Sequence, residues 1–409
     1  MMDDTMPFFE FVEINPKVTL KKGIEYPFVE MDIVTPGRRY VSSINKRIYN
    51  GGGAKFQFGD TLFARITPCL ENGKIAQFSG AKDEIGFGST EFFVFRHKEG
   101  ISDPGYIFYL ASSDILRKPA EKSMSGASGR QRADIASIKD LEIPTPPLPT
   151  QRKIASILSA YDDLIENNTR RIKILEEMAQ ALYREWFVNF RFPGHEKVKM
   201  VESELGMVPK GWEEVTIRDV SSYINRGISP KYDDLSRQIV INQKCIRDGR
   251  FNLNLVRRHS TKVPVEKFVK FGDVLINSTG IGTLGRVAQI CQEISDCTVD
   301  SHVSIVRPND RVSHEYFGSY LATLEPHFDS QGIGSTGQTE LGRETIAKTI
   351  FLLPPKGLQD RFAEIVSPMR KNVVKMFIKN INLRRTRDLL LPKLISGEVD
   401  VEKIDVLMA

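Results

Sequence analysis

Two long stretches of the chain carry apolar residues at alternating spacings of three and four, the pattern of a helix that packs along one narrow seam. The first seam consists of Ile154, Leu158, Tyr161, Ile165, Asn168, Ile172, Leu175, Ala179, Leu182 and Trp186. The second consists of Phe362, Val366, Met369, Val373, Met376, Asn380, Leu383, Arg387, Leu390 and Leu394. Each pattern predicts a helix of roughly 48 Å. A seam this narrow favours pairing of the two helices with each other, while amphipathic helices lying on separate globular cores are the alternative.

The second seam is the first one displaced by 208 residues, and the rest of the chain repeats with it. Phe58–Leu62 recurs as Phe271–Leu275 at an offset of 213, and the diproline Pro146–Pro147 recurs as Pro354–Pro355 at 208. The ordered set of matches indicates two copies of one unit of about 200 residues.

Each copy has the same predicted plan. Short alternating runs at 91–96 and 302–307 predict strands, and each diproline favours extended chain directly before a long helix. The predicted fold class is α+β: two repeated domains of mixed α/β content, joined by two long antiparallel coiled-coil-like helices with pseudo-twofold symmetry. The predicted segments are a first domain (1–149), a first helix (150–192), a linker (193–211), a second domain (212–353), a second helix (354–397) and a tail (398–409). Asn168 and Asn380 either fix the helix register or are tolerated near solvent.

Positive charge is concentrated at similar depths in the two copies. The net charge is only +5, but residues 38–74 and 237–270 each contain many cations and only two acidic residues. These cations are Arg38, Arg39, Lys46, Arg47, Lys55, Arg65 and Lys74 in the first copy, and Arg237, Lys244, Arg247, Arg250, Arg257, Arg258, Lys262, Lys267 and Lys270 in the second. Two basic stretches in corresponding places indicate surfaces that face a polyanion.

Small polar loops with glycine recur before each diproline, at 125–132 and 335–339. Arg and Gln side chains on such loops suit base edges and Ser and Thr suit phosphates, although an ordinary solvated loop explains either one alone. Together with the basic stretches they predict further DNA contacts. These are Ser89, Thr90, Arg130, Gln131 and Arg132 in the first copy, and Arg226, Lys231, Asn277, Ser278, Thr279, Arg286, Ser301, His302, Thr336 and Gln338 in the second.

Signatures of enzymes are few. Gly280–Gly285 fits the GxGxxG pattern of a dinucleotide-binding loop, but the alternating run Arg286–Ile290 predicts a hairpin strand where that fold needs a helix. We therefore interpret these glycines as turn residues. The proline-rich segment 144–149 could be a peptide ligand, but a rigid joint before the helix explains it better.

Other classes of protein are excluded by composition and short motifs. The six histidines form no HExxH or HxH pattern, so we expect no metal site, and the four cysteines form no CxxC pair and are expected to be reduced thiols of a cytoplasmic protein. No apolar run reaches the roughly 18 residues that span a bilayer. The start, MMDDTMPFFE, is acidic where a secretory leader is basic, so we expect no leader.

Several longer motifs resemble one family throughout the chain. They are Ile143–Ile154 (IPTPPLPTQRKI), Leu164–Asn168 (LIENN), Leu205–Trp212 (LGMVPKGW), the degenerate second diproline with Gln359, and the ending Leu391–Glu398 (LPKLISGE). By these motifs the chain resembles the DNA specificity subunits of Type I restriction–modification systems. Its start, Phe11–Pro16, departs from the entry motif of the second half, which leaves the beginning of the first domain open.

The resemblance implies a non-catalytic reader of double-stranded DNA with two target-recognition domains and an asymmetric, two-part target. It implies two methyltransferase subunits and two ATP-driven restriction subunits as partners, with S-adenosylmethionine, ATP and magnesium on those partners and no cofactor in this chain. The outward helix faces would dock the methyltransferases, through Asn167, Arg171, Glu177, Arg370, Lys371 and Arg384. The alternatives are a repeat scaffold that binds only proteins, and an enzyme built on Gly280–Gly285.

Overall fold

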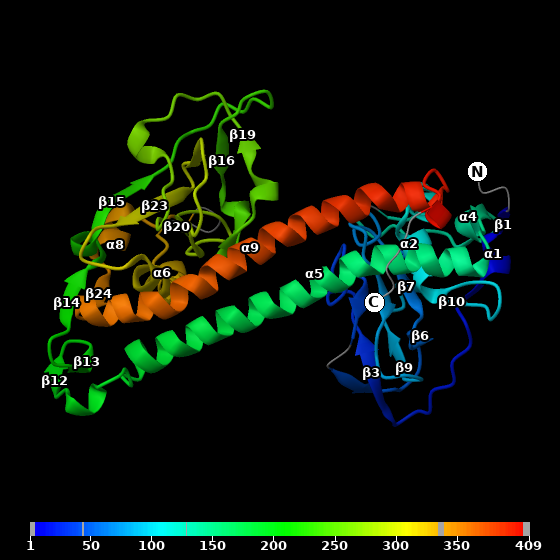
Figure 1. Ribbon diagram of the computed structural model, residues 1–409, viewed down its shortest axis with the longest axis horizontal. Coiled ribbons are helices and arrows are strands. Elements are labelled where there is room, and N and C mark those ends of the chain that lie inside the picture. Colours follow the sequence, from blue (N-terminus) through cyan, green and yellow to red (C-terminus); the bar gives the residue numbers. More distant parts are fainter. Residues whose placement is uncertain (1–4, 43–44, 128, 334–338, 404–409) are drawn as a thin grey trace. The chain divides into compact units, whose positions relative to one another are not determined.

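The computed structural model describes residues 5–42, 45–127, 129–333 and 339–403 of the 409-residue chain. It divides into two compact units (Figure 1). Unit 1 comprises Met1–Arg170 and Ile378–Ala409, and unit 2 comprises Arg171–Phe377. Each unit therefore combines one mixed α/β domain with one end of each long helix, whereas the sequence predicted the helices as segments separate from the domains.

The domain of unit 1 is built on two sheets. The central sheet has the strand order β2 (Val12–Ile14), β10 (Phe92–His97), β7 (Thr61–Ala64), β8 (Ile75–Phe78) and β4 (Tyr40–Val41). The second sheet has the order β5 (Lys46–Ile48), β3 (Glu25–Val29), β9 (Ile85–Gly88) and β6 (Ala54–Gln57). Alternate residues of β7 and β10 point to opposite faces, so that Leu62 packs toward Phe56 of the second sheet and Phe63 toward the helices.

Helices cover the other face of the central sheet in unit 1. They are α1 (Phe8–Phe11), α2 (Pro104–Ser112), α3 (Asp114–Lys122) and α4 (Ala136–Lys139), with the strand pair β1 (Thr5–Pro7) and β11 (Glu142–Pro144) beside them. The α2 helix begins where the Asp103 side chain accepts a hydrogen bond from the Tyr106 backbone nitrogen at 3.0 Å, with Pro104 at the first helical position.

The domain of unit 2 repeats this plan. Its central sheet has the order β15 (Ser221–Arg226), β23 (Val303–Pro308), β20 (Val274–Asn277) and β21 (Val287–Gln289), and its second sheet has β19 (Arg257–Arg258), β16 (Ile239–Ile241) and β22 (Cys297–Val299). Two-stranded pairs are β14 (Glu213–Thr216) with β24 (Ile350–Leu353), β12 (Met200–Ser203) with β13 (Gly206–Pro209), and β17 (Ile246–Arg247) with β18 (Arg250–Phe251). The helices are α6 (His314–Thr323), α7 (Glu325–Ser330) and α8 (Arg343–Lys348).

Equivalent side chains make equivalent contacts in the two domains, which confirms the internal repeat. Arg96 donates to Asp60 through Nε and Nη2 at 2.8 and 2.7 Å, and Arg307 donates to Asp273 through the same atoms at 2.8 Å each. Gln151 also has a counterpart. Its Nε2 donates to the Pro146 carbonyl, and Gln359 Nε2 donates to the Pro354 carbonyl, both at 2.8 Å. The diproline joint is therefore built in the same way twice.

Both predicted long helices form. They are α5 (Leu148–Tyr183), extended by one π-helical turn at Arg184–Val188, and α9 (Lys356–Ile395). Their 36 and 40 residues give lengths of about 54 and 60 Å, somewhat longer than the roughly 48 Å predicted, because each helix begins directly after its diproline.

The seam residues of the two helices face each other within each unit. In unit 1, Asn168 donates from Nδ2 to Asn380 Oδ1 at 2.8 Å, and Asp162 forms an ion pair with Arg387. Because the lower-numbered residue of α5 faces the higher-numbered residue of α9, the two segments are antiparallel there. In unit 2 the Trp186 ring lies 6.0 Å from that of Phe362. The two asparagines are 6% and 3% exposed, so they form a buried pair and are not solvated positions.

Candidate nucleic-acid interface

Two consecutive cations lie on an edge strand at the same place in each domain. Lys46 and Arg47 are on β5, and Arg257 and Arg258, offset by 211 residues, are on β19. Each strand is the edge of its sheet and pairs antiparallel with the next strand, β3 or β16. All four side chains are exposed. We call these two segments the dibasic edge strands.

Aromatic rings support the arginines of the dibasic edge strands. The Arg47 guanidinium lies 4.2 Å from the centre of the Phe28 ring and is paired with Glu30, and that of Arg257 lies 3.2 Å from the centre of the Tyr232 ring. Arg258 donates from Nη1 to the Ser236 carbonyl at 2.6 Å. A stacked guanidinium keeps free N–H groups at the surface, which suits contacts to phosphate. The sequence interpretation missed both rings, although Tyr232 stands next to the predicted contact Lys231.

A closed loop stands at the same end of the central sheet in each domain. In unit 1, Ser125 and Arg132 exchange backbone hydrogen bonds of 3.1 and 2.9 Å, and the Ala133 nitrogen donates to the Arg65 carbonyl at 2.7 Å. In unit 2, Ile333 and Glu340 exchange two bonds of 3.0 Å, and the Leu341 nitrogen donates to the Ser278 carbonyl at 2.9 Å. We call 125–132 and 333–340 the closed loops. The stems of the two loops, at 125 and 132 and at 333 and 340, are therefore equivalent in the fold, while 334–338 lie outside the described residues.

Charged side chains hold both closed loops to the sheet. Glu91 accepts bonds from Arg132 Nε at 3.0 Å and Nη2 at 2.7 Å, and from Arg65 Nε at 3.3 Å. These bonds, those from Arg132 first, hold the pKa of Glu91 below its usual range. In unit 2, Arg226 Nη2 pairs with Glu340 at 2.8 Å. Neither glutamate was predicted from the sequence, although the 208-residue offset aligns Glu340 with Arg132.

Some predicted contacts are committed to the interior of their own domain. Asn277 and Ser278 are fully buried, with Ser278 Oγ 2.6 Å from Ser304 Oγ, so neither reaches a ligand at the surface in this structure. They were predicted as contacts from loop chemistry and repeat correspondence, but the Leu341 nitrogen donates to the Ser278 carbonyl and the two side chains are bonded inside the domain. Four of the predicted cations also bind groups of the protein itself. Arg38 forms an ion pair with Glu166, Arg39 donates to the Gln77 side chain, Lys74 donates to the Met31 carbonyl and Arg286 donates to the Gly282 carbonyl.

The other predicted contacts lie at or near the surface. Lys55 is half-buried over the Tyr49 ring, Thr279 Oγ1 lies 2.7 Å from His302 Nδ1, and Arg250 pairs with Glu176. Thr336 and Gln338 lie outside the described residues. The remaining candidates are the exposed Thr90, Arg130, Lys231, Lys244, Arg247 and Lys262, and the half-buried Ser89, Gln131 and Ser301.

Two regions of the chain match the family described as "Type I restriction modification DNA specificity domain", over residues 10–177 and 209–382. The chain belongs to this family. It is similar to the MjaIX specificity subunit of Methanocaldococcus jannaschii, at 26% identity over 75% of this chain and 71% of the relative. It is also similar to the HindI specificity subunit of Haemophilus influenzae, at 25% identity over 83% and 86%. The solved Type I S subunit from M. genitalium has the same fold, with a TM-score of 0.56, 18% identity and coverage of 96% of each chain.

Specificity subunits of this family recognise DNA and carry no catalytic site, which confirms the expectation of a non-enzymatic reader. The glycine-rich segment agrees with that assignment. Gly280, Gly282 and Gly285 all have positive φ, and a Cβ on Gly285 would lie 2.5 Å from the Asp329 backbone nitrogen. The segment joins β20 to β21, which pair antiparallel. It is therefore the loop of an antiparallel hairpin and not the start of a nucleotide-binding helix.

Among the described residues, no three histidine, cysteine or acidic side chains are placed together as metal ligands. None of the described helices combines the length and apolar character that crossing a bilayer requires.

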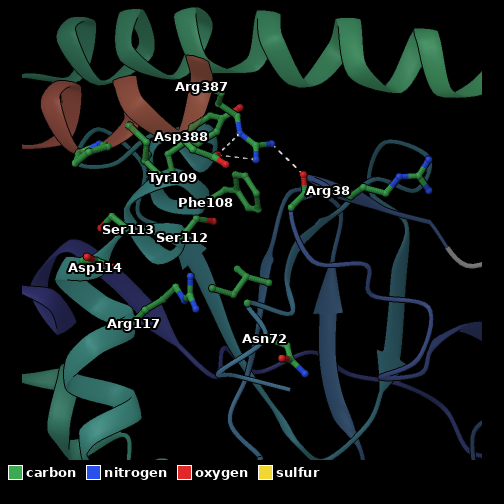
Figure 2. Close-up of a pocket in the computed structure, with 15 residues that line it drawn as sticks. Arg38, Asn72, Phe108, Tyr109, Ser112, Ser113, Asp114, Arg117, Arg387 and Asp388 are labelled. Carbon is green, nitrogen blue, oxygen red and sulfur yellow. Dashed lines mark hydrogen bonds and ion pairs between the residues drawn. The ribbon is translucent and has the colours of Figure 1, made fainter. Parts of the chain in front are cut away.

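A cavity of about 370 Å³ in unit 1 lies where α2 and α3 meet the end of α9 (Figure 2). Its charged groups are paired: Arg387 donates to the Gly37 carbonyl at 2.9 Å and to Asp388, and Arg117 pairs with Glu121 at 3.1 Å. No histidine or cysteine lines it. The arrangement is a polar joint between the domain and the helix.

The residues predicted to dock partner subunits divide into two groups. Asn167, Arg171, Glu177 and Lys371 are exposed on the long helices, as expected. Arg370 and Arg384 are half-buried, and Arg370 Nη2 donates to Ser319 Oγ at 2.8 Å. Burial lowers the pKa of Arg384. These two arginines therefore differ from the outward position that the sequence suggested, and Arg370 does so because it contacts the α6 helix of its own domain.

We expect the second specificity domain to become less stable as the pH is lowered, because of His259. This side chain is 0% exposed and directly follows the dibasic edge strand. Burial lowers its pKa, with partial opposition from the Ile239 backbone. Below about pH 6.5 the unfolded chain gains a proton that the folded chain does not yet accept, so the free energy of unfolding decreases as pH falls. Urea unfolding between pH 7.5 and 5 measures this dependence, which H259Q should flatten. Equal pH dependence in both proteins would contradict the assignment.

Proposed function

We propose that this specificity subunit reads an asymmetric, two-part sequence in double-stranded DNA, one part with each target-recognition domain (1–149 and 212–353), and leaves a gap between them unread. The observation that carries the proposal is the repetition of a dibasic edge strand and a closed loop in both domains. The loops have equivalent anchors but different residues, which suits two domains that read different bases.

The proposed DNA contacts fall into two classes. Phosphate contacts come from the dibasic edge strands and from the exposed Lys231, Lys244, Arg247 and Lys262. Base contacts come from the closed loops, with Arg130 and Gln131 in the first domain and Thr336 and Gln338 in the second. This division gives affinity to the sheets and sequence recognition to the loops.

We propose that the helices at 150–192 and 354–397 form an antiparallel, coiled-coil-like spacer that relates the two domains by a pseudo-twofold axis. Facing seam residues in both units support this arrangement. The spacer would dock two methyltransferase subunits through exposed residues such as Asn167, Arg171 and Lys371, and through them two restriction subunits. S-adenosylmethionine, ATP and magnesium would bind to those partner subunits. The complex would act in the cytoplasm, where the four cysteines of this chain stay reduced.

Lengthening the spacer should change the gap and nothing else. One heptad inserted into each of α5 and α9 keeps the seam in phase and adds about 10.5 Å, or about three base pairs. We expect the recognised half-sequences to stay the same and the gap to lengthen. Sequencing of the DNA selected by the variant complex checks this, and altered half-sequences would contradict the spacer role.

Competition binding tests the proposed function as a whole. The full chain, with its methyltransferase subunits, is used to select from a pool of random 40-base-pair duplexes, and the retained DNA is sequenced. We expect one gapped, asymmetric motif, bound at least about a thousandfold more tightly than random duplex. Retention without any enriched motif would instead support a protein scaffold with nonspecific affinity for DNA.

A further inference from the structure

We infer that Glu91 and Arg226 are positioning residues for DNA recognition, each acting as a latch that fixes a closed loop to the end of its central sheet. The inference rests on the proposed function, because it takes the closed loops as the elements that read bases. It assigns roles to Glu91 and Glu340, which no sequence pattern singled out, and changes the role of Arg132 and Arg226 from direct contact to support.

The latch of the first domain joins three segments of chain. Arg65 directly follows β7, Glu91 directly precedes β10, and the Arg65 nitrogen donates to the Glu91 carbonyl at 2.9 Å. Arg132 closes the loop and grips both carboxylate oxygens of Glu91. The Glu91 side chain is only 17% exposed. Its carboxylate is bonded to Arg65 at the end of the sheet and to Arg132 of the loop, and so connects the loop to the sheet.

The latch of the second domain has the opposite polarity. Glu340, at the loop position equivalent to Arg132, supplies the carboxylate, and Arg226 at the end of β15 supplies the cation. Arg226 Nη2 also donates to the Leu341 carbonyl at 2.9 Å, so this one side chain holds two consecutive residues of the loop stem. The Arg226 side chain is 23% exposed and that of Glu340 is 56% exposed.

Repetition with reversed charges is what points to a latch. A phosphate contact requires a cation or a neutral hydrogen-bond donor at the loop closure, and Glu340 is neither. Its carboxylate is instead paired with Arg226. An ion pair between the loop stem and the central sheet needs only opposite charges, and both domains meet that need. The charge-assisted, bidentate pair of the first domain also fixes the orientation of its closed loop. A loop that contacts bases needs a fixed orientation, because base edges are distinguished by hydrogen-bond geometry.

Breaking the first latch should degrade the reading of one half of the target. We expect E91Q to lower the discrimination between correct and incorrect bases in one half-sequence by about tenfold and to leave the other half unchanged. R226Q should have the same effect on the other half. The measurement is the duplex selection described above, carried out with each variant complex and scored position by position.

A reversed pair separates positioning from direct contact. The double variant E91R/R132E gives the first domain the polarity of the second, and we expect it to recover most of the discrimination lost in E91Q. The control is E121Q, which removes an Arg–Glu pair of 3.1 Å on α3 and should leave the motif unchanged.

Two results would overturn the inference. In the first, E91Q reads both halves as well as the wild type does. In the second, E91Q loses one half and the double variant does not recover it while circular dichroism shows it folded, since Arg132 would then contact DNA directly. A wild-type complex that enriches no motif would be a failure of the proposed function and is distinct from either result.

Discussion

Replacing Asp162 by alanine is expected to destabilise the protein by about 3–5 kcal/mol, because it leaves a buried guanidinium without its main partner. Asp162 is 4% exposed and Arg387 8% exposed, and the two form an ion pair between α5 and α9. Asp162 also accepts a hydrogen bond from Tyr109 Oη at 2.6 Å. Burial raises the pKa of Tyr109, so the phenol remains a donor at neutral pH. The substitution therefore removes contacts to both a helix and the domain.

Chemical denaturation followed by circular dichroism measures this loss. The matched control is E177Q on the same helix, where the ion pair with Lys173 is exposed and 3.7 Å long. Exposed pairs of this kind contribute little, so the control should change the free energy of unfolding by less than about 0.5 kcal/mol. Equal changes in the free energy of unfolding for the two substitutions would show that the buried ion pair between α5 and α9 does not stabilise the protein.

Removing the charge of both dibasic edge strands is expected to weaken DNA binding in a way that depends on salt. The slope of log K against log salt concentration is negative, and each lost phosphate contact reduces its magnitude by about 0.9. The quadruple variant K46A/R47A/R257A/R258A should therefore have a slope that is shallower by up to about 3.6. The sequence preference should remain, because phosphate contacts carry no base information. Fluorescence anisotropy from 50 to 300 mM salt measures both effects.

A different role for these cations would give a different result. Charged residues on an edge strand also prevent pairing with other chains. If that were their only role, the variant would aggregate while its remaining monomer bound DNA with an unchanged salt slope. The control variant K210A removes an exposed lysine from the predicted linker (193–211), away from the dibasic edge strands in the sequence, and should leave the slope unchanged.

Features with a strong local or repeated pattern were predictable from the sequence. The seams of α5 and α9 were read correctly because a heptad repeat is a property of neighbouring residues on one helix. The strands β10 and β23 form where short alternating runs were expected, although both faces of each strand are buried, so the buried positions are consecutive rather than alternating. The sequence repeat then allowed each domain to support the interpretation of the other.

The latch and the aromatic supports were not predictable in the same way. Glu91 and Arg132 are 41 residues apart and meet only because the closed loop pairs with the end of β7. The edge strands β5 and β19 are three and two residues long, too short to show a period. Asn277 and Ser278 were predicted as DNA contacts because nothing local indicates that their side chains bond to distant segments, at Gln243 and Ser304. Predicting these positions requires the tertiary fold.

The proposal that this subunit gives a methyltransferase its sequence specificity is tested most directly by mapping adenine methylation across the genome of the source cell, with and without this gene. The account predicts that deletion abolishes methylation at one gapped, asymmetric motif, and that a variant in one recognition domain changes only one half of that motif. A methylation map that is identical with and without the gene would contradict it.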